Sequence, residues 1–390
     1  MLFLDVTQSC RSSNNSGIQV VTRNLFRELA AVIEITPMIW DVRLCRYAKL
    51  SRNELKTLVN PFPKGYRPRS RPNKEENPVT KECLATLLRL GRRIPLSLKP
   101  SENDLLLFPE VFRDNRVIHL SKRVHPELRK TGIFYDANVT RNPKITPVRR
   151  TRNFNAYLDL IATCKVVSCI SKESENNFRK HCKKKNELPE IGTHPLPAES
   201  PPSPPEVPVQ DPPLILYVST LAYNKNHLPL LTAAEELWSE GLRFELSLIG
   251  QADPSWTPRV AERLQALASK GRPVHWLRHI DQDKLERNYS ASLFTVYPSS
   301  YEGCGLPILE SLVRGKPCLC GNNGALGEVS KGGGCLTIKE QHNPDNLADG
   351  MRRLLFDENL RQKLSREALA RDFGTWKNYA FTLLNFLKTG

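Results

Sequence analysis

Residues 297–320 of this 390-residue chain read YPSSYEGCGLPILESLVRGKPCLC. An apolar strand pattern ends at Pro298 and a helical pattern begins near Leu306, followed by a proline that suits a first helical turn. Gly303 and Gly305 in the connecting loop permit close backbone approach and unusual φ values. The stretch therefore predicts a strand, a glycine loop and a helix, with Glu302 before the helix and Glu310 inside it.

This arrangement favours a particular shape of ligand. The start of the helix presents free N–H groups and favours phosphate. Glu302 and Glu310 can reach different hydroxyl-bearing parts of one ligand. Nucleotide sugars, with phosphates in the middle and polyols at both ends, have the matching form. The plainer alternative is a surface loop with an exposed helical carboxylate.

Short apolar runs alternate with helical patterns on both sides of this stretch, which predicts an α/β fold with parallel sheets covered by helices. Expected strands lie at 2–6, 104–108, 131–135, 166–170, 214–219, 243–250, 273–278, 293–298 and 316–321. Expected helices lie at 18–32, 150–164, after Ser171, and at 227–240, 257–270, 282–291, 306–314 and 344–356.

A proline-rich segment, residues 186–213, divides the chain. Proline fixes φ and removes a hydrogen-bond donor, so this segment is expected to be extended linker rather than core. We expect an N-terminal domain at 1–198, the linker proper at 199–213 and a C-terminal domain at 214–375. Ligands bind at the carboxyl ends of the strands in open α/β sheets, so a cleft between the two domains is the expected site.

Charge is distributed unevenly about that boundary. Residues 1–200 contain 36 Lys and Arg against 20 Asp and Glu, whereas residues 201–390 contain 21 of each. Residues 45–99 alone carry 14 basic and 4 acidic side chains. This excess indicates an anionic partner (a membrane surface, a phosphorylated acceptor or nucleic acid) or simply a solvated basic surface. The apolar and arginine-containing stretch 84–99 could lie on a membrane.

Several classes of protein are disfavoured. No run of residues is apolar and long enough to span a membrane, and the start MLFLDVTQSC lacks the basic lead of a signal peptide. The ten cysteines form no CxxC pair and indicate reduced thiols in a cytosol. Asp281-Gln282-Asp283 is expected to begin a helix rather than bind metal, and Cys304 to be a packed thiol rather than a nucleophile.

EGCGLPILE, residues 302–310, resembles the E-x7-E motif of retaining family-four glycosyltransferases with the GT-B fold, two Rossmann-like domains facing across a deep cleft. Further similar stretches follow in the family's order: YVSTLAYNKNHLPLLTAA (217–234), LSLIGQ (246–251), HWLRHIDQDKLERNYSAS (275–292), GNNGALGEVS (321–330) and GTWKNYA (374–380). In the first half, SGIQVVTRNLFREL (16–29) and GIFYDANVTRNP (132–143) also resemble family segments.

The resemblance implies roles for individual residues. Glu302 would contact the transferred sugar and Asp136 would orient a sugar hydroxyl, although Asp136 could equally cap a turn. Glu310 would hold the ribose. Lys225 and Thr220 would neutralise the diphosphate. The other expected donor-site positions are Gly250, Gly303, Cys304, Gly305 and Leu306, and the expected acceptor or phosphate loop contains Ser16 and Gly17.

The resemblance also implies an activity: transfer of a sugar, with retention and without metal or other cofactor, to a glycan or lipid-linked acceptor in polysaccharide biosynthesis. GDP-mannose is the preferred donor, because STLAYNKNH and PSSYEGCGLPILE are similar to mannosyltransferases of surface polysaccharide assembly. The helix at 376–390 is expected to pack back on the N-terminal domain. The expected location is cytoplasmic, and peripheral attachment to the inner face of the plasma membrane is left open.

Two alternatives remain open. The first is another enzyme of the same fold, either a UDP-sugar-dependent glucosyl- or N-acetylglucosaminyltransferase or a nucleotide-sugar epimerase. The second is a basic nucleic-acid-binding protein. No recognised nucleic-acid-binding module accompanies the basic half, so nucleic acid is not the expected partner.

Overall fold

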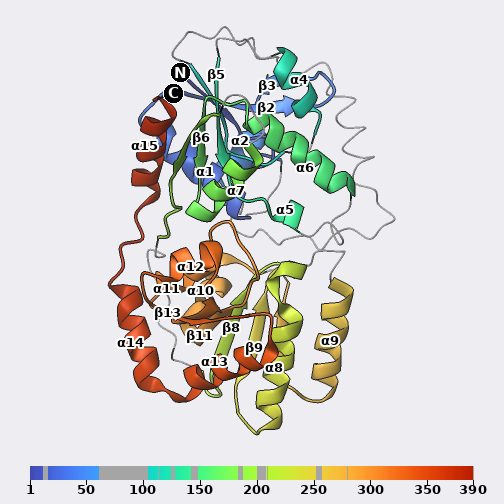
Figure 1. The fold of residues 1–390 in the computed structure, drawn as a ribbon, viewed down its shortest axis with the longest axis vertical. Coiled ribbons are helices and arrows are strands. Elements are labelled where there is room, and N and C mark those ends of the chain that lie inside the picture. Colours follow the sequence, from blue (N-terminus) through green and yellow to red (C-terminus); the bar gives the residue numbers. More distant parts are fainter. Residues whose placement is uncertain are drawn as a thin grey trace. The chain divides into compact units, whose positions relative to one another are not determined.

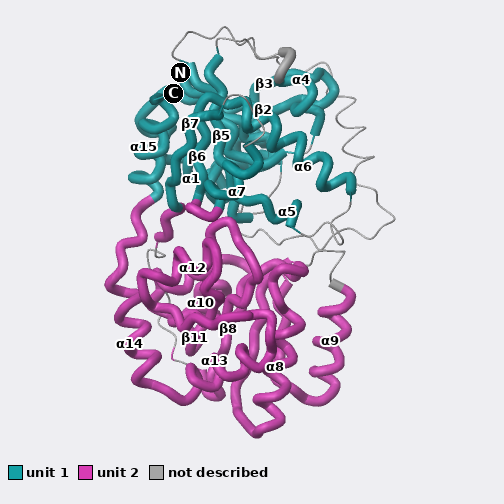
Figure 2. Tube along the Cα trace, in the orientation of Figure 1, with its two compact units in different colours: residues 1–170, 174–195, 376–390 teal, residues 171–173, 196–375 magenta. Residues whose placement is uncertain are grey.

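The computed structural model describes residues 1–11, 16–60, 104–112, 114–123, 128–141, 148–182, 188–199, 208, 210–251, 257–278 and 280–389. These residues form two compact units, coloured separately in Figure 2. Unit 1 comprises residues 1–170, 174–195 and 376–390, and unit 2 comprises residues 171–173 and 196–375. The last helix, α15 (Trp376–Leu387), therefore belongs to unit 1, where it packs beside α1 (Gly17–Ala30).

Unit 1 is built on a seven-stranded sheet of order β3-β2-β1-β4-β5-β6-β7 (Figure 1). All neighbouring strands are parallel except β2 and β3, which pair antiparallel. The strands are β1 (Leu2–Asp5), β2 (Ile35–Asp41), β3 (Arg46–Lys49), β4 (Leu105–Phe108), β5 (Arg129–Phe134), β6 (Val166–Cys169) and β7 (Glu190–Thr193). The remaining described helices of the unit are α2 (Arg52–Val59), α4 (Arg116–Arg123), α5 (Asn138–Arg141), α6 (Val148–Ile161) and α7 (Lys172–Cys182).

Unit 2 is built on a wholly parallel six-stranded sheet of order β10-β9-β8-β11-β12-β13. The strands are β8 (Leu214–Val218), β9 (Glu245–Ile249), β10 (Val274–Leu277), β11 (Ser292–Tyr297), β12 (Cys318–Gly321) and β13 (Cys335–Ile338). The helices are α8 (His227–Ser239), α9 (Thr257–Ser269), α10 (Gln282–Ala291), α11 (Leu306–Leu312), α12 (Gly324–Ser330), α13 (Pro344–Phe356) and α14 (Glu358–Leu369), and Tyr223–Lys225 form a short 3-10 turn.

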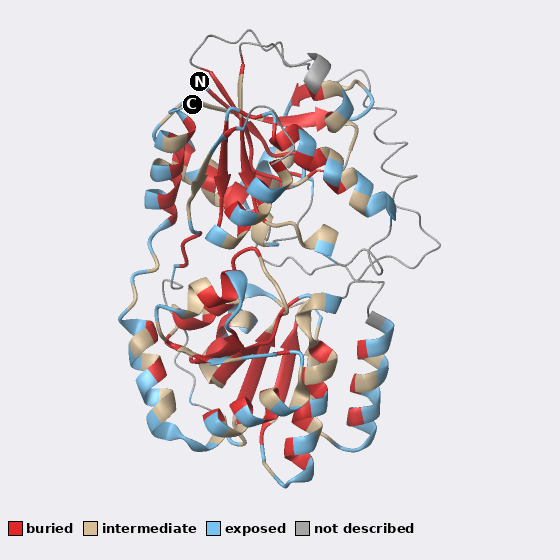
Figure 3. Cartoon of the chain, viewed as in Figure 1, coloured by how far each residue is buried: buried red, intermediate tan, exposed pale blue. Residues whose placement is uncertain are grey.

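The two sheets supply the cores. Strands such as LLLF of β4 and LILYV of β8 are apolar along their whole length, because a parallel sheet covered on both faces buries both sets of side chains. Figure 3 shows the strands mostly buried and the outward faces of the helices exposed. The core of unit 2 joins β8, β9, β11 and β12 to the inward faces of α8, α9 and α13.

The parallel α/β architecture matches the expected fold class, and the expected strands and helices of both halves form within a few residues of their predicted bounds. The periodicity missed the strands β2, β3 and β13 and the helices α2, α4, α5, α12 and α14, and the antiparallel β2–β3 pair departs from the all-parallel expectation. The sequence prediction for the proline-rich segment was wrong at residues 190–193. These residues form β7, which pairs with β6, because an edge strand tolerates flanking prolines that a central strand would not.

Candidate functional site

Two loops at the carboxyl ends of the neighbouring strands β8 and β11 are tied together. The backbone N–H of Ser300 donates to the carbonyl of Asn224 at 2.7 Å. The side-chain amide of Asn226 donates to the carbonyl of Pro298 at 2.7 Å and to the hydroxyl of Ser300 at 2.9 Å. Asn226 has a φ of 51°, a left-handed conformation that asparagine tolerates well. The loops that carry Lys225 and Glu302 are therefore held as one structure.

Lys225 and Glu302 meet in this structure. The ammonium of Lys225 donates to Oε1 of Glu302 and, at 2.9 Å, to the hydroxyl of Tyr297. The same carboxylate oxygen accepts hydrogen bonds from the hydroxyls of Tyr297, at 3.1 Å, and of Ser299. The side chains of Lys225 and Glu302 are 16% and 12% exposed, so the pair is largely buried but still accessible to a ligand.

Two aromatic side chains, those of Tyr217 and His227, support the backbone at Lys225. The hydroxyl of Tyr217, a buried residue of β8, donates to the Lys225 carbonyl at 2.6 Å. The imidazole of His227 stacks on the Tyr217 ring, with centroids 4.7 Å apart. Burial and the charge of Lys225 lower the pKa of His227 to about 3, so this histidine is neutral at physiological pH. A neutral support avoids placing a second positive charge beside Lys225.

Glu310, the second carboxylate of the motif, lies in a separate polar group on α10 and α11. The hydroxyl of Tyr289 donates to Oε2 of Glu310 at 3.1 Å. Arg314 donates to the Glu310 carbonyl at 2.6 Å and forms two hydrogen bonds of 2.7 Å each with the carboxylate of Glu286. Burial raises the pKa of Glu310, while Arg314 and Tyr289 act in the opposite direction. The structure thus gives the two carboxylates different partners and different environments.

The glycine loop between the carboxylates has the predicted character. Gly305 precedes α11 with a φ of 86°, a left-handed conformation that favours glycine. Cys304 is buried, and burial raises the pKa of its thiol to about 12. The thiol is therefore packed, as expected, and burial keeps it protonated. Gly303 and Leu306 complete the backbone of this loop.

Gly250 brings the end of β9 against the end of β8. A Cβ atom at Gly250 would lie 2.1 Å from the carbonyl oxygen of Ser219, and the residue has a φ of 150°. Only glycine fits this contact. Thr220, the next residue after Ser219, is exposed beside it. The predicted positions Thr220, Lys225, Gly250 and Glu302 thus all lie at the carboxyl edge of the unit 2 sheet, where α/β folds bind ligands.

Asp136, Ser16 and Gly17 belong to unit 1, unlike the other predicted site residues. Asp136 accepts a hydrogen bond of 2.8 Å from the backbone N–H of Asn138, which is the turn-capping geometry left open by the sequence. Ser16 caps α1: its backbone N–H and its hydroxyl both donate to the side-chain oxygen of Gln19, at 3.0 and 3.1 Å. Gly17 is the first residue of that helix.

Sequence reasoning missed the polar residues that organise both units. In unit 2 these are Tyr297, at the last position of β11, and Tyr289. In unit 1, Asp5 accepts a 2.6 Å hydrogen bond from Arg116. Glu110 accepts backbone hydrogen bonds of 2.7 Å each from the loop after β1, and burial raises its pKa to about 7. For Asp5, Glu110 and Tyr297 the available signal was a polar residue at the end of an apolar strand or shortly after it.

Asp281-Gln282-Asp283 begins a helix, as expected. Asp281 caps α10 by accepting a hydrogen bond of 2.7 Å from the backbone N–H of Lys284. Among the residues that the structure describes, no group of three or more potential ligands is placed to hold a metal ion.

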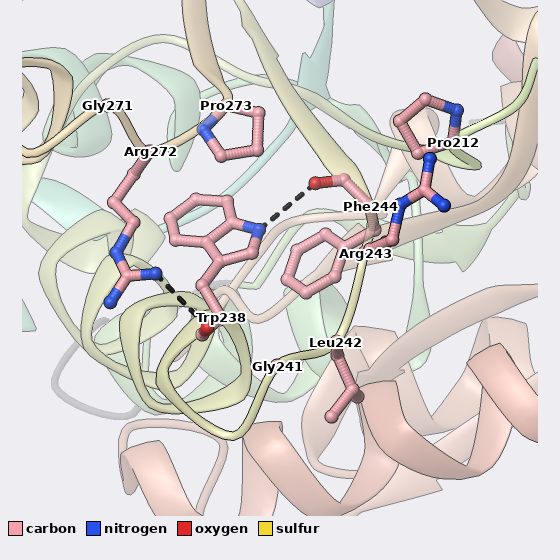
Figure 4. Close-up of a pocket in the computed structure, with 9 residues that line it drawn as sticks. All are labelled: Pro212, Trp238, Gly241, Leu242, Arg243, Phe244, Gly271, Arg272 and Pro273. Carbon is pink, nitrogen blue, oxygen red and sulfur yellow. Dashed lines mark hydrogen bonds between the residues drawn. The ribbon is translucent and has the colours of Figure 1, made fainter.

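A pocket of about 320 Å³ lies at the opposite, amino edge of the unit 2 sheet (Figure 4). The indole of Trp238 donates to the Phe244 carbonyl at 3.0 Å, and Arg272 donates to the Trp238 carbonyl at 3.1 Å. The arginine thus satisfies the carboxyl end of α8. This pocket holds none of the predicted site residues.

Part of the chain is similar to a known protein family. Residues 203–371 match the family described as glycosyl transferases group 1. The chain is 30% identical over 176 residues to O-antigen chain mannosyltransferase B of Escherichia coli, an alignment that covers 44% of this chain and 45% of that relative. The chain therefore spans less than half the length of this curated relative.

Solved structures share the fold. Sucrose-phosphate synthase from Thermosynechococcus elongatus matches with a TM-score of 0.65 at 17% identity, covering 98% of this chain and 97% of that one. WaaG, a glycosyltransferase involved in lipopolysaccharide biosynthesis, matches with a TM-score of 0.62 at 13% identity over the whole of both chains. The chain has the GT-B fold, and its residues 203–371 match the glycosyl transferases group 1 family.

Proposed function

We propose that this chain is a retaining, metal-independent glycosyltransferase that uses a nucleotide-activated sugar in polysaccharide biosynthesis. The meeting of Lys225 and Glu302 at the carboxyl edge of the unit 2 sheet carries the proposal. The ammonium of Lys225 would neutralise a diphosphate, and it lies beside the carboxylate of Glu302, which would contact a sugar. Glu310, with its own partner Tyr289, is the proposed ligand of the ribose.

The chemistry follows from charge. The bond between the anomeric carbon and the phosphate oxygen breaks, and its electron pair leaves with the diphosphate. Lys225 and exposed Thr220 would neutralise that leaving group, which is the main electrostatic demand of the step. Glu302 would stabilise positive charge at the anomeric carbon. The acceptor oxygen attacks from the same face and passes its proton to the departing phosphate, so the configuration is retained.

The donor and the acceptor would bind to different units. Unit 2 carries the family match and all of the predicted donor-site residues, so it would bind the nucleotide sugar. Unit 1, with Asp136, Ser16 and Gly17, would bind a glycan or lipid-linked acceptor. GDP-mannose is the proposed donor, supported by the 30% identity to a mannosyltransferase over 176 residues.

A panel of nucleotide sugars tests the proposal. GDP-mannose should raise the melting temperature of the full chain more than UDP-glucose or UDP-N-acetylglucosamine, because bound ligand stabilises the native state. Excess EDTA should leave both the shift and sugar transfer intact. Preference for a UDP-sugar would replace the donor but keep the enzyme class. Stabilisation by none of the panel, or strict dependence on Mn²⁺ or Mg²⁺, would overturn the proposal.

A cytoplasmic location at the inner face of the plasma membrane completes the proposal. The segment 45–99 that motivated it lies mostly outside the described residues, which include only 45–60 of it. Elsewhere in unit 1, outside that segment, the first turns of α6 expose Val148, Arg149, Arg150 and Arg152. Basic side chains beside an exposed apolar one suit an anionic lipid surface. No helix in the described parts of the chain has the length and apolar character of a membrane span.

A further inference from the structure

Three donors converge on one oxygen of Glu302. Lys225, Tyr297 and Ser299 all donate to Oε1. A carboxylate oxygen has two lone pairs in the plane of the group, so it cannot accept three hydrogen bonds with good geometry at once. Glu302 therefore loses little hydrogen-bonding energy when Lys225 leaves, because the hydroxyls of Tyr297 and Ser299 still donate to it.

Lys225 is correspondingly occupied. Two of its three N–H donors meet Tyr297 and Glu302, and its charge is balanced by the carboxylate. A diphosphate offers several charged oxygens and is a stronger partner for an ammonium than a single carboxylate is. One lysine with three donors cannot serve both partners fully.

We propose that the diphosphate of the donor and the carboxylate of Glu302 compete for Lys225. In the resting protein Glu302 holds the lysine. An arriving diphosphate binds the lysine instead. The carboxylate of Glu302 is then free of the ammonium and available to the sugar, while the hydrogen bond from Tyr297 keeps it oriented. Tyr297 is then a positioning residue, and the sugar-binding carboxylate is released only when a diphosphate is present. This inference rests on the proposed function.

Loss of a residue from a binding site ordinarily weakens ligand binding. The competition predicts the opposite for Glu302: removal of its charge should strengthen phosphate binding. Glu302→Gln should bind GDP, UDP and inorganic pyrophosphate more tightly than the wild type, by about threefold to fivefold, the scale of a partly exposed ion pair. Isothermal titration of the full chain measures this. Glu236→Gln, which alters an exposed carboxylate on α8, is the matched control and should bind as the wild type does.

A double-mutant cycle separates competition from simple repulsion between negative charges. Lys225→Met should weaken pyrophosphate binding, and adding Glu302→Gln to it should give no recovery, because the contested ammonium is gone. If Glu302→Gln tightens binding equally in both backgrounds, repulsion explains the gain and the competition is wrong.

Tyr297→Phe provides a readout that packing alone would not change. The variant keeps the ring and loses the hydroxyl that donates to Glu302 at 3.1 Å. With the donor that the panel identifies, kcat should fall by about tenfold, the scale of one hydrogen bond to a charged group, with little change in KM. A purely structural role would lower the melting temperature without that separation.

The binding data separate failure of the competition from failure of the proposed function. If the wild type binds GDP or UDP and Glu302→Gln binds no tighter, the competition fails and the proposed function stands. If the wild type binds none of GDP, UDP, pyrophosphate and the sugar nucleotides, the proposed function fails and the competition fails with it.

Discussion

The imidazole of His227 stacks on the ring of Tyr217 with 4.7 Å between centroids, and both of its ring nitrogens are buried without a hydrogen-bond partner in the described structure. Burial lowers its pKa from 6.5 to about 3. Between these two values the unfolded chain binds a proton that the folded chain excludes. The folded state therefore loses stability as the pH falls below 6.5.

His227→Phe should remove this acid-sensitive component, since phenylalanine keeps the stack and does not titrate. Between pH 7 and pH 5 the wild type should lose about 2 kcal/mol more than the variant. Melting temperatures of both proteins at several pH values give the comparison. Parallel losses in the two proteins would show that His227 is not the group responsible.

Glu302→Ala should reduce turnover by more than ~100-fold, the scale of losing a principal electrostatic group. The variant should keep the wild-type circular dichroism spectrum, because Glu302 lies in a loop at the edge of the sheet. Glu236→Ala should retain full activity. Near-normal kinetics in a folded Glu302→Ala would reject the assignment of this carboxylate.

Glu310→Gln should weaken nucleotide binding by about tenfold and leave kcat largely intact, because a hydrogen bond to a charged group is lost. Burial raises the pKa of Glu310, so wild-type affinity should fall as the pH is lowered through that raised value. The variant should lack this decline. Donor KM measured from pH 5 to pH 8 tests both points, and an identical pH profile in the two proteins would contradict the assignment.

Gly250→Ala should destabilise unit 2 by about 3 kcal/mol, because strained backbone and a direct clash combine. The added Cβ would lie 2.1 Å from the Ser219 carbonyl. Gly241→Ala is the matched control: its φ is 90° but nothing lies within 4 Å of its Cβ, so only backbone strain is added. Equal losses in the two variants, measured by urea unfolding, would remove the clash from the explanation.

Binding to vesicles tests the membrane proposal. The full chain should bind anionic but not neutral vesicles, since each basic residue near the surface contributes about 1 kcal/mol. High salt should abolish binding, because the Debye length shrinks from ~10 Å at 0.1 M to ~3 Å at 1 M.

Charge reversal locates the contact. Reversal at Arg67, Arg69 and Arg71, which lie outside the described residues, and reversal at Arg149 and Arg152 of α6 should each weaken vesicle binding. Equal binding to both vesicle types, or none at low salt, would point to a soluble acceptor instead.

The sequence alone determined the parallel α/β class, the order of the elements around residues 297–320 and the placing of Glu302 and Glu310 about a glycine loop. These features are local. Apolar runs, glycine spacing and helix starts act over one strand, loop or helix at a time, so the pattern records them directly.

Only the tertiary structure decided which side chains meet. β7 forms within a proline-rich segment because β6 offers it an edge to pair with, and that partner does not appear in the local pattern. Lys225 and Glu302 are 77 residues apart in the chain, and Tyr289 and Glu310 are 21 apart. The first pair forms because the neighbouring parallel strands β8 and β11 bring their carboxyl ends to one edge, and the second joins side chains of the helices α10 and α11. Periodicity encodes neither long-range arrangement.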